Sequence, residues 1–258
     1  MTRNGRQNEL LELVTARNEC SVEELARHFG VSDMTIRRDL ALLATQGRVI
    51  RTYGGAAPAD RISFEFQFRG RAESHAAAKA AIAGAAAKLV HARQTIMLDT
   101  GTTTLALARE LRGGEKLTVV TASLAIASEL QFCEQVKVLL LGGYLRQGSP
   151  DVVGPLTEQN LEGLRGDIAF IGADAIGLDG AVYNADMAVA RMLKGMIATA
   201  KKVYCIADSS KINRQALMRM AWLKDWDALI TDGALEPPHQ KALQKTGVRI
   251  IVAPGMSR

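Results

Sequence analysis

The sequence lacks the features that mark several large classes of protein. No stretch of its 258 residues approaches the roughly 20 consecutive apolar residues that a membrane-spanning helix needs. The N-terminal segment MTRNGRQNELLELV has no long apolar core and carries Glu9 and Glu12, which is not typical of a signal peptide. The three cysteines, Cys20, Cys133 and Cys205, are odd in number, far apart and set among apolar neighbours, which indicates reduced thiols. We therefore expect a cytoplasmic protein without disulfide bonds.

Metal-binding patterns are also missing. The cysteines and the four histidines show no C-x-x-C or H-x-x-x-H spacing, so we predict neither a metal site nor a cofactor. The chain does have a net charge of +5 and a pI near 9.2, and arginines outnumber acidic residues between Ser32 and Ala57. This balance is compatible with a nucleic-acid partner, but a motif must carry that conclusion.

Changes in hydrophobic periodicity along the chain, with proline and glycine between the segments, divide it into three parts. Residues 1–57 are short periodic segments, which predict a small helical domain with a hairpin. Residues 58–74 have no clean period and contain Pro58 and Gly70, so we interpret them as a linker. In residues 75–258, near-continuous apolar runs such as TIMLD, LTVVT and IAFIGAD alternate with helical patterns. This alternation predicts an α/β domain with a mostly parallel sheet and right-handed crossovers.

The first part has the spacing of a helix-turn-helix. Ser21 and Glu24 form a capping box that opens a helix, and Gly30 ends that helix. Ser32 is placed to cap the next helix, from Asp33 to about residue 44. Apolar residues at helical spacing predict the other two helices. Leu10, Leu13 and Val14 line the helix that precedes the capping box, and Ile36, Leu40 and Leu43 line the helix capped by Ser32. Together these signals predict a winged helix-turn-helix, with RVIRTYGGA as the wing.

The helix after Gly30 is the predicted DNA reader, because its outward residues lie at the end that enters a major groove. Arginine can donate two hydrogen bonds to guanine or bind a phosphate, and threonine can hydrogen-bond either a base edge or the DNA backbone. The alternative is a plain three-helix bundle with solvated arginines, but the joint occurrence of cap, glycine, stripe, paired arginines and wing favours DNA binding. The candidate DNA-binding residues are Ser32, Met34, Thr35, Arg37, Arg38, Arg48, Arg51, Tyr53 and Gly54.

The run VSDMTIRRDLALLATQGRVIRTYGGA resembles the N-terminal signature of the DeoR-type bacterial transcriptional regulators. Its most specific parts are TIRRDL and the R-x-x-GGA tail. The resemblance implies that the helix holding Thr35, Arg37 and Arg38 is the recognition helix. Tyr53 stands where histidine is commoner in that family, so the resemblance does not imply a direct role for this side chain.

The sharpest chemical signal in the second part is IMLDTGTTTLALAREL. It predicts a strand that ends at Asp99, a turn at Gly101, and a helix opened by Thr102, Thr103 and Thr104. Backbone N–H groups at a helix start, with threonine hydroxyls and the helix dipole, form an anion site. The threonines could equally do no more than cap the helix. No G-K-[ST] follows, so this is not a Walker loop.

Other polar residues follow strands that should end at the same edge of the sheet, where ligands of open α/β sheets bind. Carboxylates there would accept hydroxyl hydrogens, while the threonine loop and basic side chains would hold phosphate. The alternative is that Asp99 and Asp174 are helix caps and that Lys211 lies on the surface. The candidate effector-binding residues are Asp99, Gly101, Thr102, Thr103, Thr104, Gly142, Gly143, Arg146, Asp174 and Lys211.

The motifs LDTGTTT, GG-x-x-R, DIAFIGAD and IADSSK, in this order, resemble the DeoR-type sensor domain, which shares its fold with sugar-phosphate isomerases. The resemblance covers nearly the whole chain. It implies a phosphorylated sugar or polyol as effector, operator DNA as partner, a homo-oligomer (dimer or tetramer), and a repressor of carbohydrate-utilisation genes. Two segments depart from the family pattern and bear on the pocket: Val182–Asn184 with Ala188-Val189, and TASL at Thr121–Leu124.

Two other functions fit the sequence less well than a regulator does. A sugar-phosphate isomerase-like enzyme carrying a DNA module needs a general base in the pocket, but His75, His91 and His239 fall away from the predicted strand ends. An architectural DNA binder without an effector leaves the large second domain unexplained. We therefore predict a regulator without catalytic residues.

Overall fold

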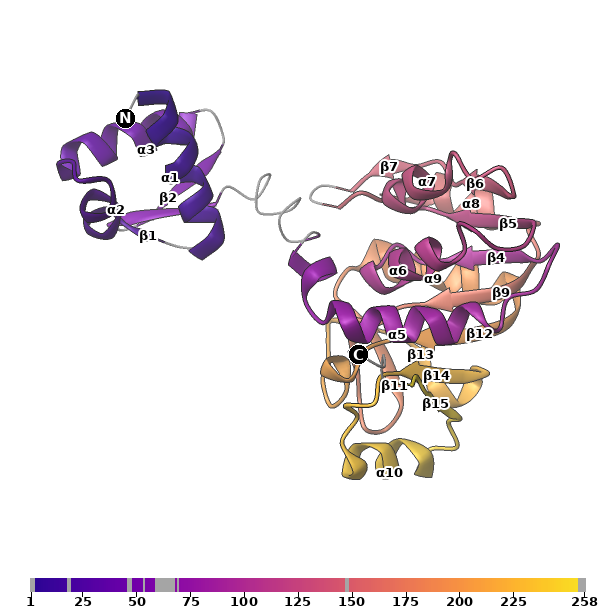
Figure 1. Ribbon diagram of the computed structural model, residues 1–258. Coiled ribbons are helices and arrows are strands. Elements are labelled where there is room, and N and C mark those ends of the chain that lie inside the picture. Colours follow the sequence, from indigo (N-terminus) through magenta and orange to yellow (C-terminus); the bar gives the residue numbers. More distant parts are fainter. Residues whose placement is uncertain are drawn as a thin grey trace. The chain divides into compact units, whose positions relative to one another are not determined.

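The computed structural model describes residues 3–17, 20–45, 48–52, 54–58, 68, 70–146 and 149–254, with the backbone alone for residues 3, 4, 50, 51, 57 and 58. The chain divides into two compact units, a small one within Met1–Arg71 and a larger one formed by Ala72–Arg146 and Pro150–Arg258 (Figure 1). Most of the predicted linker, residues 59–67 and 69, lies outside the described residues. The boundaries 1–57, 58–74 and 75–258 therefore stay a prediction.

The small unit is a winged helix-turn-helix. Its helices are α1 (Arg3–Arg17), α2 (Val22–Phe29) and α3 (Asp33–Thr45). They enclose one core with an antiparallel sheet of order β1-β3-β2, formed by β1 (Cys20–Ser21), β2 (Val49–Thr52) and β3 (Gly55–Pro58). The predicted apolar stripes are confirmed: Leu10, Val14, Ile36, Leu40 and Leu43 are at most 1% exposed, and Leu13 packs against them.

The predicted ends of α2 are confirmed in detail. The Ser21 hydroxyl accepts a hydrogen bond from the Glu24 N–H at 3.1 Å, and the Glu24 carboxylate accepts one from the Ser21 N–H at 2.9 Å. These bonds satisfy N–H groups that a helix start leaves without intrahelical partners. Gly30 ends the helix with φ of 62°, a left-handed conformation that glycine adopts at little cost.

The wing has a third strand that the sequence did not predict. β2 and β3 form the expected hairpin, and β3 also pairs with the two-residue strand β1. The Val22 N–H donates to the Gly54 carbonyl at 2.8 Å, which ties the wing turn to the start of α2. A Cβ at Gly55 would overlap the carbonyl oxygen of Cys20, so this close approach requires glycine.

The larger unit is built on a seven-stranded parallel sheet, which confirms the predicted α/β class with a mostly parallel sheet. The strand order is β15-β14-β12-β9-β4-β5-β6. In chain order the strands are β4 (Thr95–Leu98), β5 (Leu117–Thr121), β6 (Val136–Leu140), β9 (Gly166–Ile171), β12 (Ala200–Ile206), β14 (Ala228–Thr231) and β15 (Ile250–Val252). The smaller β-elements are a hairpin of β7 (Tyr144–Leu145) and β8 (Val152–Val153), and an antiparallel sheet of β10 (Ala175–Ile176), β11 (Ala181–Asn184) and β13 (Met218–Trp222).

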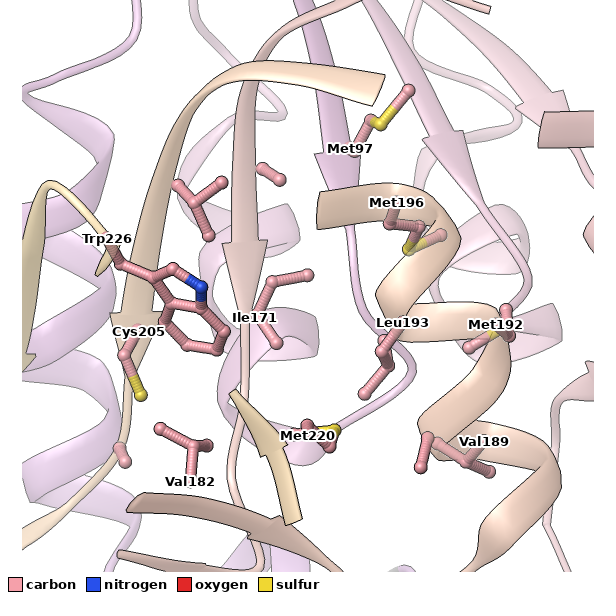
Figure 2. Close-up of a cluster of buried hydrophobic side chains, with 14 of the residues drawn as sticks. Met97, Ile171, Val182, Val189, Met192, Leu193, Met196, Cys205, Met220 and Trp226 are labelled. Carbon is pink, nitrogen blue, oxygen red and sulfur yellow. The ribbon is translucent and has the colours of Figure 1, made fainter. Parts of the chain in front are cut away.

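Helices cover this sheet and bury its apolar residues. They are α5 (Ala76–Ala87), α6 (Thr102–Glu110), α7 (Leu124–Leu130), α8 (Pro155–Leu161), α9 (Met187–Thr199) and α10 (Pro237–Lys245), with short 3-10 helices η1 (Ser209–Lys211) and η2 (Leu223–Asp225). α5, α6 and α7 pack side by side, while α9 packs against α8 and the small sheet. Figure 2 shows four α9 side chains, Val189, Met192, Leu193 and Met196, in the cluster that also holds Met97, Ile171 and Cys205 from the large sheet.

The strand order fixes where a ligand site is expected. From β4 the chain moves to β5 and β6 on one side, and β9, β12, β14 and β15 are added on the other side. The order therefore reverses between β4 and β9, and ligands of open α/β sheets bind beyond the carboxyl ends of the strands at such a point. Asp99 follows β4 there, and Gly172 to Asp174 follow β9.

Candidate DNA-binding surface and effector site

The start of α3 presents two exposed basic side chains. Arg37 and Arg38 are exposed, and neither has a hydrogen-bond or ion-pair partner among the described side chains. Met34 beside them is 61% exposed, which is unusual for a large apolar residue. Ser32 caps the helix by accepting from the Thr35 N–H at 3.4 Å, and the Ser32 and Thr35 hydroxyls lie 3.0 Å apart. The surface therefore offers two guanidinium groups and one apolar side chain for a DNA groove.

The other candidate DNA-binding residues lie near the wing. Arg48 is half-buried, and its backbone N–H donates to the Leu43 carbonyl at 2.8 Å. Gly54 is exposed at the hairpin turn with φ of 87°. The side chain of Arg51 and the whole of Tyr53 lie outside the described residues, so their predicted roles are not addressed by the structure.

Asp39, within the TIRRDL run, has a structural role that sequence reasoning missed. It is 1% exposed, and its carboxylate accepts from the Arg6 Nε at 2.8 Å and from the Gln7 Nε2 at 2.7 Å. These contacts join α3 to α1 at the position that follows the exposed Arg37 and Arg38 in the sequence. No local signal separates this aspartate from a solvated one, because both of its partners lie more than 30 residues earlier.

In the larger unit, Asp99 lies at the reversal of strand order. It is 5% exposed, and its carboxylate accepts from the Thr100 N–H and, at 2.8 Å, from the Gly172 N–H. Burial raises the pKa of Asp99 to about 6, the two backbone hydrogen bonds oppose that rise, and the charges of Asp174 and Asp151 add to it. Asp99, Asp151 and Asp174 thus share one electrostatic environment.

The threonine loop that follows has two kinds of threonine. Thr104 is fully buried, and its hydroxyl lies 2.9 and 2.8 Å from the carbonyl oxygens of Asp99 and Gly101, so it holds the turn together. Gly101 is the N-cap residue of α6 and has no side chain to cap it, while Thr103 is 8% exposed and Thr102 is half-buried. The backbone N–H groups at such a helix start are suited to an anion.

Arg146, predicted to hold phosphate, already has carboxylate partners. Its Nε and Nη2 donate to the two oxygens of Asp151 at 3.1 and 3.0 Å, and its Nη1 lies 3.4 Å from an oxygen of Asp186. The Asp186 carboxylate also caps α9 by accepting from the Ala188 and Val189 N–H groups. Asp151 and Asp186 were not among the predicted residues; only Asp186 had a sequence signal, as a capping residue before the helical run MAVARMLK.

The remaining candidates have distinct surroundings. The Gly142 N–H donates to the Asn160 Oδ1 at 2.7 Å, and a Cβ at Gly143 would overlap the Thr157 hydroxyl, so both glycines allow close packing against α8. The Asp174 carboxylate accepts from the Ala185 N–H at 2.8 Å. Lys211 is half-buried in η1, and its ammonium has no hydrogen-bond or ion-pair partner within the described part of the chain.

The structure therefore brings Asp99, Gly101 and Asp174 together at one sheet edge, with Asp151 linking them to Arg146. No contact joins Lys211 to them among the described residues. Two hollows of the larger unit lie away from Asp99. One of about 400 Å³ lies between α6 and α7, and one of about 270 Å³ is lined by Ser209 and Ser210 of η1 together with His239 of α10.

Among the described residues, no helix combines the length and the hydrophobicity that a membrane span requires. The described part of the chain also contains no group of three or more histidine, cysteine or acidic side chains arranged to hold a metal ion.

Comparison with known proteins assigns both units. Residues 6–61 match the DeoR-like helix-turn-helix domain, and residues 74–233 match the DeoR C terminal sensor domain. The chain belongs to the DeoR family of transcriptional regulators. It is 32% identical over 249 residues to a putative aga operon transcriptional repressor of Escherichia coli O157:H7, covering 96% of this chain and 93% of that protein. It is also 32% identical over 245 residues to the glycerol-3-phosphate regulon repressor of Escherichia coli K12, covering 95% of each.

Among solved structures, ribose 5 phosphate isomerase A from Neisseria gonorrhoeae is similar to 52% of this chain and 52% of that chain, with 21% identity and a TM-score of 0.40. The relatives named above are transcriptional regulators. The prediction of a DNA-binding regulator rather than an enzyme is thus confirmed by the family.

Proposed function

We propose that this regulator is a repressor of carbohydrate-utilisation genes whose operator affinity is controlled by a phosphorylated sugar or polyol. The effector site lies at the carboxyl ends of β4 and β9, and the protein acts as a homo-oligomer, a dimer or tetramer, that places two recognition helices on one operator. In this proposal α3 reads the operator through Arg37 and Arg38.

The observation that carries the effector proposal is the set of polar groups at the reversal of strand order. Asp99 and Asp174 can accept hydrogen bonds from sugar hydroxyls, and the start of α6 after Gly101 suits a phosphate. Lys211, without a partner among the described residues, is an available cation following the neighbouring strand β12. One relative, the glycerol-3-phosphate regulon repressor, is named for a phosphorylated polyol, which supports this class of effector.

A thermal-shift screen with matched pairs tests the proposal. The full chain is heated with free and phosphorylated forms of the same sugars and polyols, glycerol and glycerol 3-phosphate among them. A compound that binds only the native state stabilises it by about 2.7 kcal/mol at a hundredfold excess over its dissociation constant. We expect at least one phosphorylated compound to raise the melting temperature while its free counterpart does not. Equal effects of both forms across the panel would remove the phosphate from the proposal.

A further inference from the structure

The guanidinium of Arg146 is held by two carboxylates that differ in their access to solvent. The Asp151 side chain is fully buried and bonds two nitrogens of Arg146, at 3.1 and 3.0 Å. The Asp186 side chain is 36% exposed and makes one longer contact, at 3.4 Å. The contact with Asp151 is therefore closed to solvent, and the weaker contact with Asp186 lies on the accessible side.

The charges around Arg146 are unfavourable for an incoming anion. One guanidinium faces the carboxylates of Asp151 and Asp186, and the charge of Asp99 interacts with the charges of Asp151 and Asp174. Three of the five N–H groups of this guanidinium are directed at carboxylates, so a phosphate gains the full positive charge of Arg146 only if one carboxylate gives up its contact. Asp151 cannot leave at low cost, because a buried carboxylate without its partner is strongly destabilising. Asp186 can turn toward water.

Asp186 is positioned independently of Arg146. Its Oδ1 accepts from the Ala188 N–H at 2.8 Å and the Val189 N–H at 3.1 Å, and its own N–H donates to the Asn184 Oδ1 at 2.8 Å. The other oxygen, Oδ2, is the one directed at Arg146. The start of α9 thus presents one carboxylate oxygen, Oδ2, to the guanidinium.

We infer that Asp186 is a built-in competitor of the effector, and that the phosphate group of the effector replaces its carboxylate at Arg146 while the Arg146–Asp151 pair stays intact. This inference rests on the proposed function, because it takes phosphate as the entering anion. A doubly charged phosphate gains more from a guanidinium than a singly charged carboxylate does. The competitor therefore selects phosphorylated compounds against sugar acids. The exchange also releases the start of α9 from the hairpin that carries Arg146.

Inorganic phosphate and the variant Asp186→Asn test the inference in the full chain. Asparagine keeps an oxygen that can cap α9 and removes the competing charge. Asp179→Asn is the matched control, because Asp179 also accepts a backbone hydrogen bond, from the Ala181 N–H at 3.1 Å, but does not contact Arg146. We expect Asp186→Asn to lower the phosphate dissociation constant by about tenfold, or ~1.4 kcal/mol, and Asp179→Asn to leave it unchanged.

A second comparison separates competition at Arg146 from a general effect of charge. In an Arg146→Gln/Asp151→Asn background, which removes the buried pair together, phosphate binding should weaken and Asp186→Asn should no longer improve it. An equal improvement in both backgrounds, or an unchanged dissociation constant in the single variant, would overturn the inference while phosphorylated compounds still stabilise the wild type. If no phosphorylated compound stabilises either protein, the proposed effector class fails and the inference fails with it.

Discussion

At the residue scale, neighbouring side chains of α3 divide between the surface and the interior. Arg37 and Arg38 are exposed without partners among the described residues, whereas Asp39 is buried and bonded to Arg6 and Gln7 of α1. Substitutions one position apart should therefore affect different properties of the protein.

Arg38→Ala should weaken binding to a selected DNA site by about 1–3 kcal/mol, because a forked contact to a base or a phosphate contact is lost. The unfolding free energy of Arg38→Ala should change by no more than about 0.5 kcal/mol.

Asp39→Ala should lower the unfolding free energy of the small unit by about 1–3 kcal/mol, because its buried hydrogen-bond partners lose their acceptor. Fluorescence anisotropy with DNA and urea unfolding followed by circular dichroism measure the two effects. Unchanged DNA affinity in Arg38→Ala would exclude this side chain from the reading surface.

Asp99 should make stability depend on pH in a defined window. Its pKa is raised from 3.8 to about 6 in the folded state, so the folded protein binds more protons than the unfolded chain between these values. The unfolding free energy should therefore fall as pH rises through this window, by about 3 kcal/mol relative to Asp99→Asn. The difference between the two proteins, measured by urea unfolding at pH 4 and pH 7, isolates this group from other carboxylates. A difference that does not change with pH would contradict the assigned pKa.

Lys211 provides a test of the effector site that leaves the fold intact. Because its ammonium has no partner among the described residues, Lys211→Met should change stability little. It should weaken binding of the phosphorylated compound by about tenfold or more, because an ion pair with phosphate is lost. Lys202→Met is the control, since Lys202 is an exposed lysine within β12 itself. Equal responses of the two variants in the thermal-shift assay would place Lys211 outside the site.

At the element scale, the helices of the small unit could be predicted because their signals are local. The capping box at Ser21 and Glu24, the left-handed Gly30 and the stripe of α3 each lie within a few residues of one another. The strand β1 could not be predicted, because two residues have no period and are defined only by pairing with β3 more than 30 positions later. The role of Asp39 could not be predicted for the same reason, because its partners Arg6 and Gln7 lie more than 30 positions earlier.

In the larger unit, apolar runs predicted strands but not their order. Which strand ends lie together depends on β4 pairing with β9, more than 60 residues apart, and that pairing joins Asp99 to Gly172. The rule that ligands bind at the carboxyl edge predicted, without the strand order, that Asp99 and Asp174 lie at one edge of the sheet. It could not show that Arg146 is already paired, because an ion pair with Asp151, five positions away, has no periodic signal and Asp186 lies 40 positions away.

Two glycines should respond to alanine in opposite ways. Gly55→Ala places a Cβ against the Cys20 carbonyl, so it should separate β1 from β3, lower stability by about 1–3 kcal/mol and weaken DNA binding. Gly84→Ala lies within α5 with open space around it, so it should raise stability by about 0.5–1 kcal/mol. Thermal unfolding of both variants checks the pair. A harmless Gly55→Ala would contradict the close approach of β1 to the wing.

At the scale of the whole molecule, regulation requires the two units to be coupled in free energy. The small unit carries the DNA surface and the larger unit carries the candidate effector site. An effector can change operator affinity only by its different affinity for two arrangements of the protein. DNA fragments selected by the full chain should contain repeated half-sites, spaced by about one turn of DNA or a multiple of it, if two recognition helices bind together.

The most direct test titrates such a selected DNA fragment with the full chain, alone and with a saturating phosphorylated compound identified in the thermal-shift screen. The unphosphorylated form of the compound is the control. The account predicts that the phosphorylated compound weakens DNA binding by about fivefold or more, at constant salt, and that its free form has no effect. Equal DNA affinity in all three conditions would contradict the coupling of a phosphate-binding site to operator binding.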